Sequence, residues 1–157
     1  MATMVSRLLE AAELLIEQGD NSSAFRRRAV STAYYAVFHA LAKRCADELL
    51  QPIGRSSDEY SRVYRALEHG TLKSAFSLKE SPLNKRQNLR TIGDSLVRLQ
   101  SERHRADYLP PIANVFSLRQ AQKLVNQARS AITEIEALNK QDRRILATHL
   151  LFRSRLQ

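Results

Sequence analysis

The sequence predicts an all-α protein, and three observations lead to this prediction. Apolar residues recur at three- and four-residue spacing over most of the 157 residues, which is the pattern of amphipathic helices. Gly and Pro number only four each, too few for a sheet protein with many turns. They also fall mostly between the periodic segments rather than inside them. A chain of this length is expected to form one domain with a sizeable core.

Two helices are predicted in the first third of the chain, over residues 4–18 and 24–50. Gly19 ends the first helix, and Ser22 or Ser23 is the expected N-cap of the second. The second helix is apolar on most of its surface, so we expect it to be central and covered on several sides. Its expected core positions are Phe25, Ala29, Val30, Ala33, Tyr34, Val37, Phe38, Leu41, Cys45 and Leu49.

Shorter helical segments follow. A helix over residues 58–69 is expected to begin at Ser57 or Asp58 as the cap and to stop at Gly70. Residues 71–79 are ambiguous, with a helical turn as one interpretation. Another helix begins at Pro82, and Gly93 lies inside it. Because Gly costs about 1 kcal/mol relative to Ala in a helix, a close packing contact is expected there.

The last long helix is expected to follow Ser117 as its cap and to run to Leu138. The periodic pattern weakens after that residue and resumes at Ile145, where the chain either continues the helix or breaks from it. We therefore divide the sequence into a helical bundle over residues 1–138 and a basic C-terminal helical extension or tail over residues 139–157.

Ionisable side chains gather at the end of the helix that begins at Pro82. Its apolar face, advanced at about 100° per residue, leads from Leu99 to Arg103 and Asp107. An unpaired buried charge is costly, and a helix C-terminus disfavours an anion, so Arg103 should compensate Asp107. One interpretation is a structural ion pair between residues i and i+4. The other is a functional cluster, with Arg103, His104, Asp107 and Tyr108 as candidate catalytic residues.

The charge balance is strongly basic. Lys and Arg number 25 against 16 Asp and Glu, a net charge of +9. An anionic partner is therefore expected, with nucleic acid first and an acidic protein second, although a solvated helix face is the simpler interpretation of each cluster. The candidate residues for binding RNA or a partner are Arg26, Arg27, Arg28, Arg105, Arg143 and Arg144.

Several classes of protein are not expected. Cys45 is the only cysteine, so no intrachain disulfide can form and a reducing cytoplasm fits. Glu10 and Glu13 interrupt the first apolar segment, unlike in a secretory signal. The apolar run over residues 33–42 is too short for a bilayer, which needs about 20 residues. No glycine-rich phosphate loop, zinc-ligand spacing or nucleophile elbow occurs, so neither a cofactor nor a metal is expected.

Three segments resemble the HEPN superfamily. Residues 27–40, RRAVSTAYYAVFHA, resemble its second-helix signature. Residues 63–70, VYRALEHG, look like the following short helix of one bacterial branch, and residues 103–108, RHRADY, are similar to the Arg-x-x-Ala-Asp-Tyr segment of that branch. The resemblance covers roughly residues 5–138. It implies a HEPN-like up-and-down bundle of four to five helices and, commonly, a homodimer with the two motifs facing each other across a cleft.

The resemblance also implies a function. Many HEPN proteins are metal-independent ribonucleases, often toxins or phage-defence effectors, and their partner is frequently a nucleotidyltransferase antitoxin. In the ribonuclease motif an Arg is followed by a polar residue and later by a His. Arg103 matches the Arg and His104 the polar position, while Tyr108 stands where the final His is expected.

Two hypotheses follow. In the first, the protein cleaves RNA. Arg103 binds the phosphate bidentately, His104 acts as base or acid, Asp107 orients either of them, and Tyr108 donates a hydrogen bond. In the second, catalysis has lapsed, and the domain holds RNA, a nucleotide or a nucleotidyltransferase partner.

Overall fold

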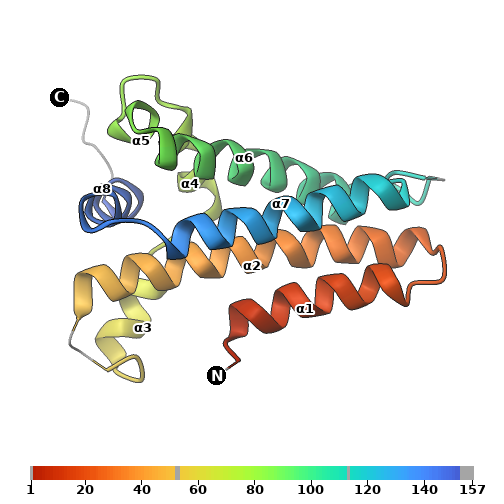
Figure 1. The fold of residues 1–157 in the computed structure, drawn as a ribbon, viewed down its shortest axis with the longest axis horizontal. Helices are drawn as coiled ribbons and strands as arrows, with labels where there is room; N and C mark the ends of the chain where they lie inside the picture. The colour runs from red at the N-terminus through yellow and green to blue at the C-terminus, as the bar shows by residue number, and fades with distance from the viewer. Residues whose placement is uncertain (1, 52–53, 113, 153–157) are drawn as a thin grey trace. The chain divides into compact units, whose positions relative to one another are not determined.

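The computed structural model describes residues 2–51, 54–112 and 114–152, and throughout these residues the only regular secondary structure is helical (Figure 1). This confirms the predicted all-α class. The helices in the described residues are α1 Met4–Glu17, α2 Ser23–Leu50, α3 Asp58–Arg65, α4 His69–Ser77, α5 Pro82–Lys85, α6 Gln87–Tyr108, α7 Leu118–Glu136 and α8 Lys140–Leu151. These eight exceed the predicted four to five, because α4, α5 and α8 are separate elements. None of the described helices is long and apolar enough to cross a membrane.

The chain divides into two compact units that share its long helices. The first unit comprises residues 1–39 and 95–133, and the second comprises residues 40–94 and 134–157. The first unit therefore contains α1, the first part of α2, the last part of α6 and most of α7. The sequence-based boundary after residue 138 does not coincide with this division.

In the first unit, α2 is the central helix, as predicted. Ala29, Val30, Ala33, Ala36 and Val37 are all fully buried, and Ser31 and Tyr34 are at most 2% exposed. At about 100° per residue, the buried positions from Ala36 round to Ser31 cover more than half of the helix circumference. Small side chains there allow neighbouring helices to approach closely. The expected core positions at the two ends of α2, Phe25 and Leu49, are instead exposed.

The turn between α1 and α2 depends on Gly19, for a reason that the sequence did not indicate. A Cβ atom on Gly19 would lie 2.4 Å from the carbonyl oxygen of Leu15 and 2.8 Å from the Cβ of Phe25. The left-handed backbone of this turn is adopted by Asp20 and Asn21, at φ values of 45° and 61°. Gly19 is therefore needed for close packing and not for an unusual φ angle.

In the second unit, two predicted helix boundaries are wrong. The helix expected over residues 58–69 ends at Arg65, and Gly70 lies inside α4. The backbone becomes extended at Glu68, which allows the preceding Leu67 to be buried. The helix expected to run on from Pro82 is interrupted at Arg86, where the backbone is also extended.

Two buried carboxylates, Asp47 and Asp142, link elements of the second unit. Asp142 of α8 is 2% exposed and forms an ion pair with Arg86 at the break between α5 and α6. Asp47 of α2 accepts hydrogen bonds from Arg55 (2.9 Å), Tyr60 (2.9 Å) and Lys43 (3.2 Å). The bond from Tyr60 attaches α3 to α2, and the bonds from Arg55 attach the segment before α3. Helix α8 contacts α4 and α5, and its residue Asp142 pairs with Arg86. It is therefore packed as part of the second unit.

Gly93 makes the close contact that its position inside a helix predicted. A Cβ atom there would lie 2.4 Å from the Cδ1 of Phe76, a buried residue of α4. The absence of a side chain at Gly93 therefore lets the Phe76 ring pack directly against the backbone of α6.

Candidate functional site

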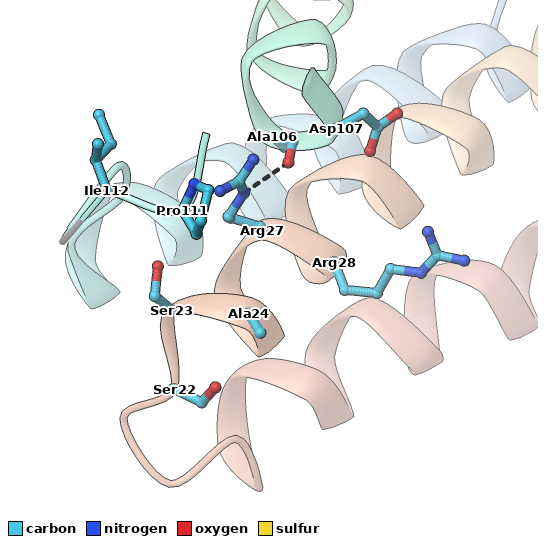
Figure 2. A pocket seen from close by; sticks show the side chains of 9 residues that line it. All are labelled: Ser22, Ser23, Ala24, Arg27, Arg28, Ala106, Asp107, Pro111 and Ile112. Atoms are coloured by element: carbon cyan, nitrogen blue, oxygen red, sulfur yellow. Dashed lines mark hydrogen bonds between the residues drawn. The ribbon is translucent and has the colours of Figure 1, made fainter. Parts of the chain in front are cut away.

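The C-terminal end of α6 is held by an arginine from α2 (Figure 2). The Nε of Arg27 donates to the carbonyl oxygen of Ala106 at 2.7 Å, and Nη1 donates to that of Pro110 at 3.2 Å. Nη2 donates to the carbonyl oxygen of Leu109. The last carbonyls of a helix have no partner within the helix, and the helix dipole favours a cation beside them. Arg27 therefore positions the RHRADY segment, and all three of its nitrogens are engaged within the fold.

Arg103 and Asp107 form the ion pair that the sequence predicted. The Nη1 of Arg103 lies 3.6 Å from the Oδ2 of Asp107, and the two side chains are 14% and 24% exposed. The Arg103 guanidinium also lies over the rings of Tyr34 and Tyr35 in α2, 5.2 Å and 5.9 Å from their centroids. Its Nε is buried and has no hydrogen-bond partner among the described residues. Arg103 is thus held by a loose ion pair and two aromatic faces, with one donor unused.

Burial also keeps Tyr34 protonated. Desolvation raises the pKa of Tyr34 well above its usual value, and the nearby Arg103 cation opposes this effect only in part. A neutral ring hydroxyl and the π face of the ring therefore both remain beside Arg103. A cation–π contact that is largely shielded from water contributes up to about 2 kcal/mol.

His104 and Tyr108 occupy a different face of α6. Their ring centroids are 4.8 Å apart, both residues are exposed, and Tyr108 is 67% exposed. Consecutive helical residues diverge by about 100°, so these rings face solvent while Arg103 faces α2. The four candidate catalytic residues therefore form two pairs. Asp107 pairs with Arg103 and not with His104. If Asp107 orients a catalytic residue, that residue is therefore Arg103.

The three adjacent arginines of α2 have three different environments. Arg26 is 7% exposed, and its guanidinium donates to the side-chain oxygens of Asn21 (2.8 Å) and Asn114 (3.5 Å). Arg27 donates to the carbonyl oxygens at the end of α6. Arg28 is exposed and has no hydrogen bond or ion pair with any described residue. Of the three, only Arg28 is available for an external anion without breaking an internal contact.

The other three predicted binding residues, Arg105, Arg143 and Arg144, form ion pairs within the fold. Arg105 is half exposed and forms an ion pair with Glu102 at 2.8 Å. In the second unit, Arg143 and Arg144 both contact Glu48, at 3.0 Å and 3.7 Å. Arg143 is the more buried of these two, whereas Arg144 remains 64% exposed.

A hollow of about 740 Å³ lies between the start of α2 and the end of α6. Its lining residues are Ser22, Ser23, Ala24, Arg27, Arg28, Ala106, Asp107, Pro111 and Ile112 (Figure 2). The unpaired Arg28 and the carboxylate of Asp107 thus border one cavity. Residues of the RHRADY segment and the side chain of Arg28 therefore line the same cavity.

Sequence reasoning missed two of these contacts. Tyr34 was correctly expected as a core residue, but nothing local indicates that the rings of Tyr34 and Tyr35 meet Arg103. The capping role of Arg27 also gave no local signal, since its acceptors lie about 80 residues away.

Comparisons of the chain with protein-family models, curated proteins and solved structures gave no match. The HEPN resemblance therefore rests on the sequence motifs alone.

Proposed function

We propose that this chain is a HEPN-type protein that acts on RNA, with its site at the end of α6 between Arg103 and Tyr108. The observation that carries the proposal is the contact of Arg103 with Tyr34 and Tyr35. These residues belong to two of the segments that resemble the superfamily, residues 27–40 and 103–108. That the two segments pack against each other favours their acting as one site.

The residues at this site suit metal-independent RNA cleavage. Such a reaction requires removal of a proton from the 2′-hydroxyl, protonation of the leaving oxygen, and stabilisation of the charge on the phosphorane. The exposed His104 can accept or donate a proton, and Tyr108 can donate a hydrogen bond. Arg103 has an unused Nε and a loose ion pair, so it can turn toward a phosphate. In the homodimer that the resemblance implies, a second copy would supply a second set of these groups.

The second candidate function is a binding module without catalysis. The low exposure of Arg103 favours it, as does the tyrosine at the position of the motif's final His. Such a module would hold RNA, a nucleotide or a nucleotidyltransferase partner.

The two candidates are separated by cleavage of labelled single-stranded RNA in EDTA, with binding measured in parallel. If the protein is a ribonuclease, the wild type cleaves RNA, whereas Arg103→Ala and His104→Ala do not. A His149→Ala variant, altered in the second unit, controls for contaminating nuclease and for handling. Binding without cleavage by the wild type indicates the binding module. A folded wild-type protein that neither binds nor cleaves RNA refutes the proposal as a whole.

A further inference from the structure

We propose that the outer edge of the contact between α6 and α7 binds the phosphate backbone of RNA, through Arg98, Arg105, Arg119 and Lys123. We call these four residues the basic track. The inference rests on the proposed function, because it takes RNA as the target. Of the four residues, only Arg105 belongs to the RHRADY segment, so most of this surface lies outside the motif.

Two contacts fix how α6 and α7 lie against each other in the first unit. The Nε2 of Gln127 donates to the Oγ of Ser95 at 3.4 Å. About ten residues further along α6, the guanidinium of Arg105 lies 5.4 Å from the centroid of the Phe116 ring, just before α7 begins. The helices are therefore antiparallel neighbours over this length, as Figure 1 also shows.

The basic track lies between these two contacts. Arg98 is three residues beyond Ser95 on α6, and Lys123 is four residues before Gln127 on α7, so each stands about one helical turn from the same contact. Because residues three or four apart share a helix face, both lie along the edge where the helices meet. Arg119 is one further turn from Lys123 on α7. Both helices thus contribute cations to one strip of surface.

Three of the four cations of the track are not used within the fold, whereas Arg105 is paired with Glu102. Arg98, Arg119 and Lys123 are exposed and have no hydrogen bond or ion pair with any described residue. Residues 95–133 contain six Lys or Arg and only two acidic residues, Glu102 and Asp107. Glu102 is paired with Arg105, and Asp107 is paired with Arg103. Both carboxylates within this segment are therefore paired, and the exposed Asp94, which has no ion pair with a described residue, lies one helical turn before Arg98 at the end of the track.

The side chains around the track favour RNA over an acidic protein. Ser101, Gln120 and Asn126 are exposed beside the cations, and such uncharged polar groups commonly contact phosphate and sugar together with Arg and Lys. Protein interfaces are usually organised around an apolar centre, whereas Arg98, Arg119 and Lys123 are separated on the helix surface by polar residues. Tyr108 is three residues beyond Arg105 and exposed, so it can stack on a base at one end of the track.

The test is the salt dependence of binding to fluorescently labelled oligo(U), measured by anisotropy with the full chain. Each phosphate contact contributes about 0.7 to the slope of log K against log salt for single strands. The double variant Arg98→Gln/Lys123→Gln should therefore bind more weakly and lower the slope by about 1.4. The matched control, Arg62→Gln/Lys73→Gln, removes the same charges from exposed and unpaired positions of α3 and α4. It should leave the slope unchanged.

The other possible results separate failure of the basic track from failure of the RNA proposal. If the wild type binds oligo(U) and both double variants match it, the basic track is wrong while the RNA proposal stands. Equal losses in the two double variants indicate a general effect of net charge and also overturn the track. If poly-L-glutamate competes as well as oligo(U) at equal charge, the surface recognises acidic polymers and not RNA. If the wild type does not bind RNA, the proposed function fails first. Unchanged thermal unfolding of Arg98→Gln/Lys123→Gln excludes loss of folding as the cause.

Discussion

Arg27 and Arg28 are adjacent and identical in type, yet the structure predicts that replacing them has different consequences. Arg27→Gln removes three hydrogen bonds from a cation to the carbonyls at the end of α6. A buried hydrogen bond to a charged group contributes about 1.5–3 kcal/mol, but here one partly exposed side chain shares three bonds. The loss of a helix cap typically costs about 0.5–2 kcal/mol. We therefore expect the free energy of unfolding to fall by about 2 kcal/mol, near the upper end of the range for caps.

For a chain of this length, that change corresponds to a decrease in Tm of about 4–8 °C. Thermal and urea unfolding followed by circular dichroism at the helix band measure both quantities. Arg28→Gln is the matched control and should change stability by less than about 0.5 kcal/mol, as expected for a surface substitution without contacts. Equal stability of the two variants would show that Arg27 does not hold the end of α6. Arg27 would then be as free as Arg28 to bind an external anion.

Three further predictions concern the second unit. Gly93→Ala should lower the free energy of unfolding, because overpacking against Phe76 costs about 1–3 kcal/mol and outweighs a gain in helix propensity of about 1 kcal/mol. Gly70→Ala, where an added Cβ meets no atom within 4 Å, should not be destabilising, and urea unfolding compares the two. Burial by itself raises the pKa of Asp47, but hydrogen bonds from three side chains hold that pKa below its usual value. Its stabilising effect is therefore present above about pH 4 and is lost as the pH falls through the lowered pKa. Urea unfolding at a series of acidic pH values should show this loss in the wild type and not in Asp47→Asn. Burial raises the pKa of the Cys45 thiol to about 12, so iodoacetamide should alkylate it only after unfolding, as mass spectrometry can verify.

The sequence by itself determined the features that depend on neighbours along the chain. Helical periodicity predicted the all-α class and the four longest helices, because an amphipathic pattern reports the face that each helix buries. Ser57 and Ser117 cap α3 and α7 as predicted, with their hydroxyls accepting from the backbone N–H groups of Tyr60 and Gln120. The pairing of Arg103 with Asp107 was also predictable, since residues four apart meet on any helix.

Tertiary structure alone decided the features that depend on distant partners. The break at Arg86 coincides with an ion pair to Asp142, 56 residues further along the chain, and no local pattern signals that partner. The same holds for the three arginines at the start of α2, which a sequence presents as one basic cluster. Successive helix positions point about 100° apart, so Arg26 and Arg27 meet acceptors from other parts of the chain while Arg28 meets solvent. Local spacing therefore indicated the longest helices, whereas long-range contacts decided the break at Arg86 and which charges remain free.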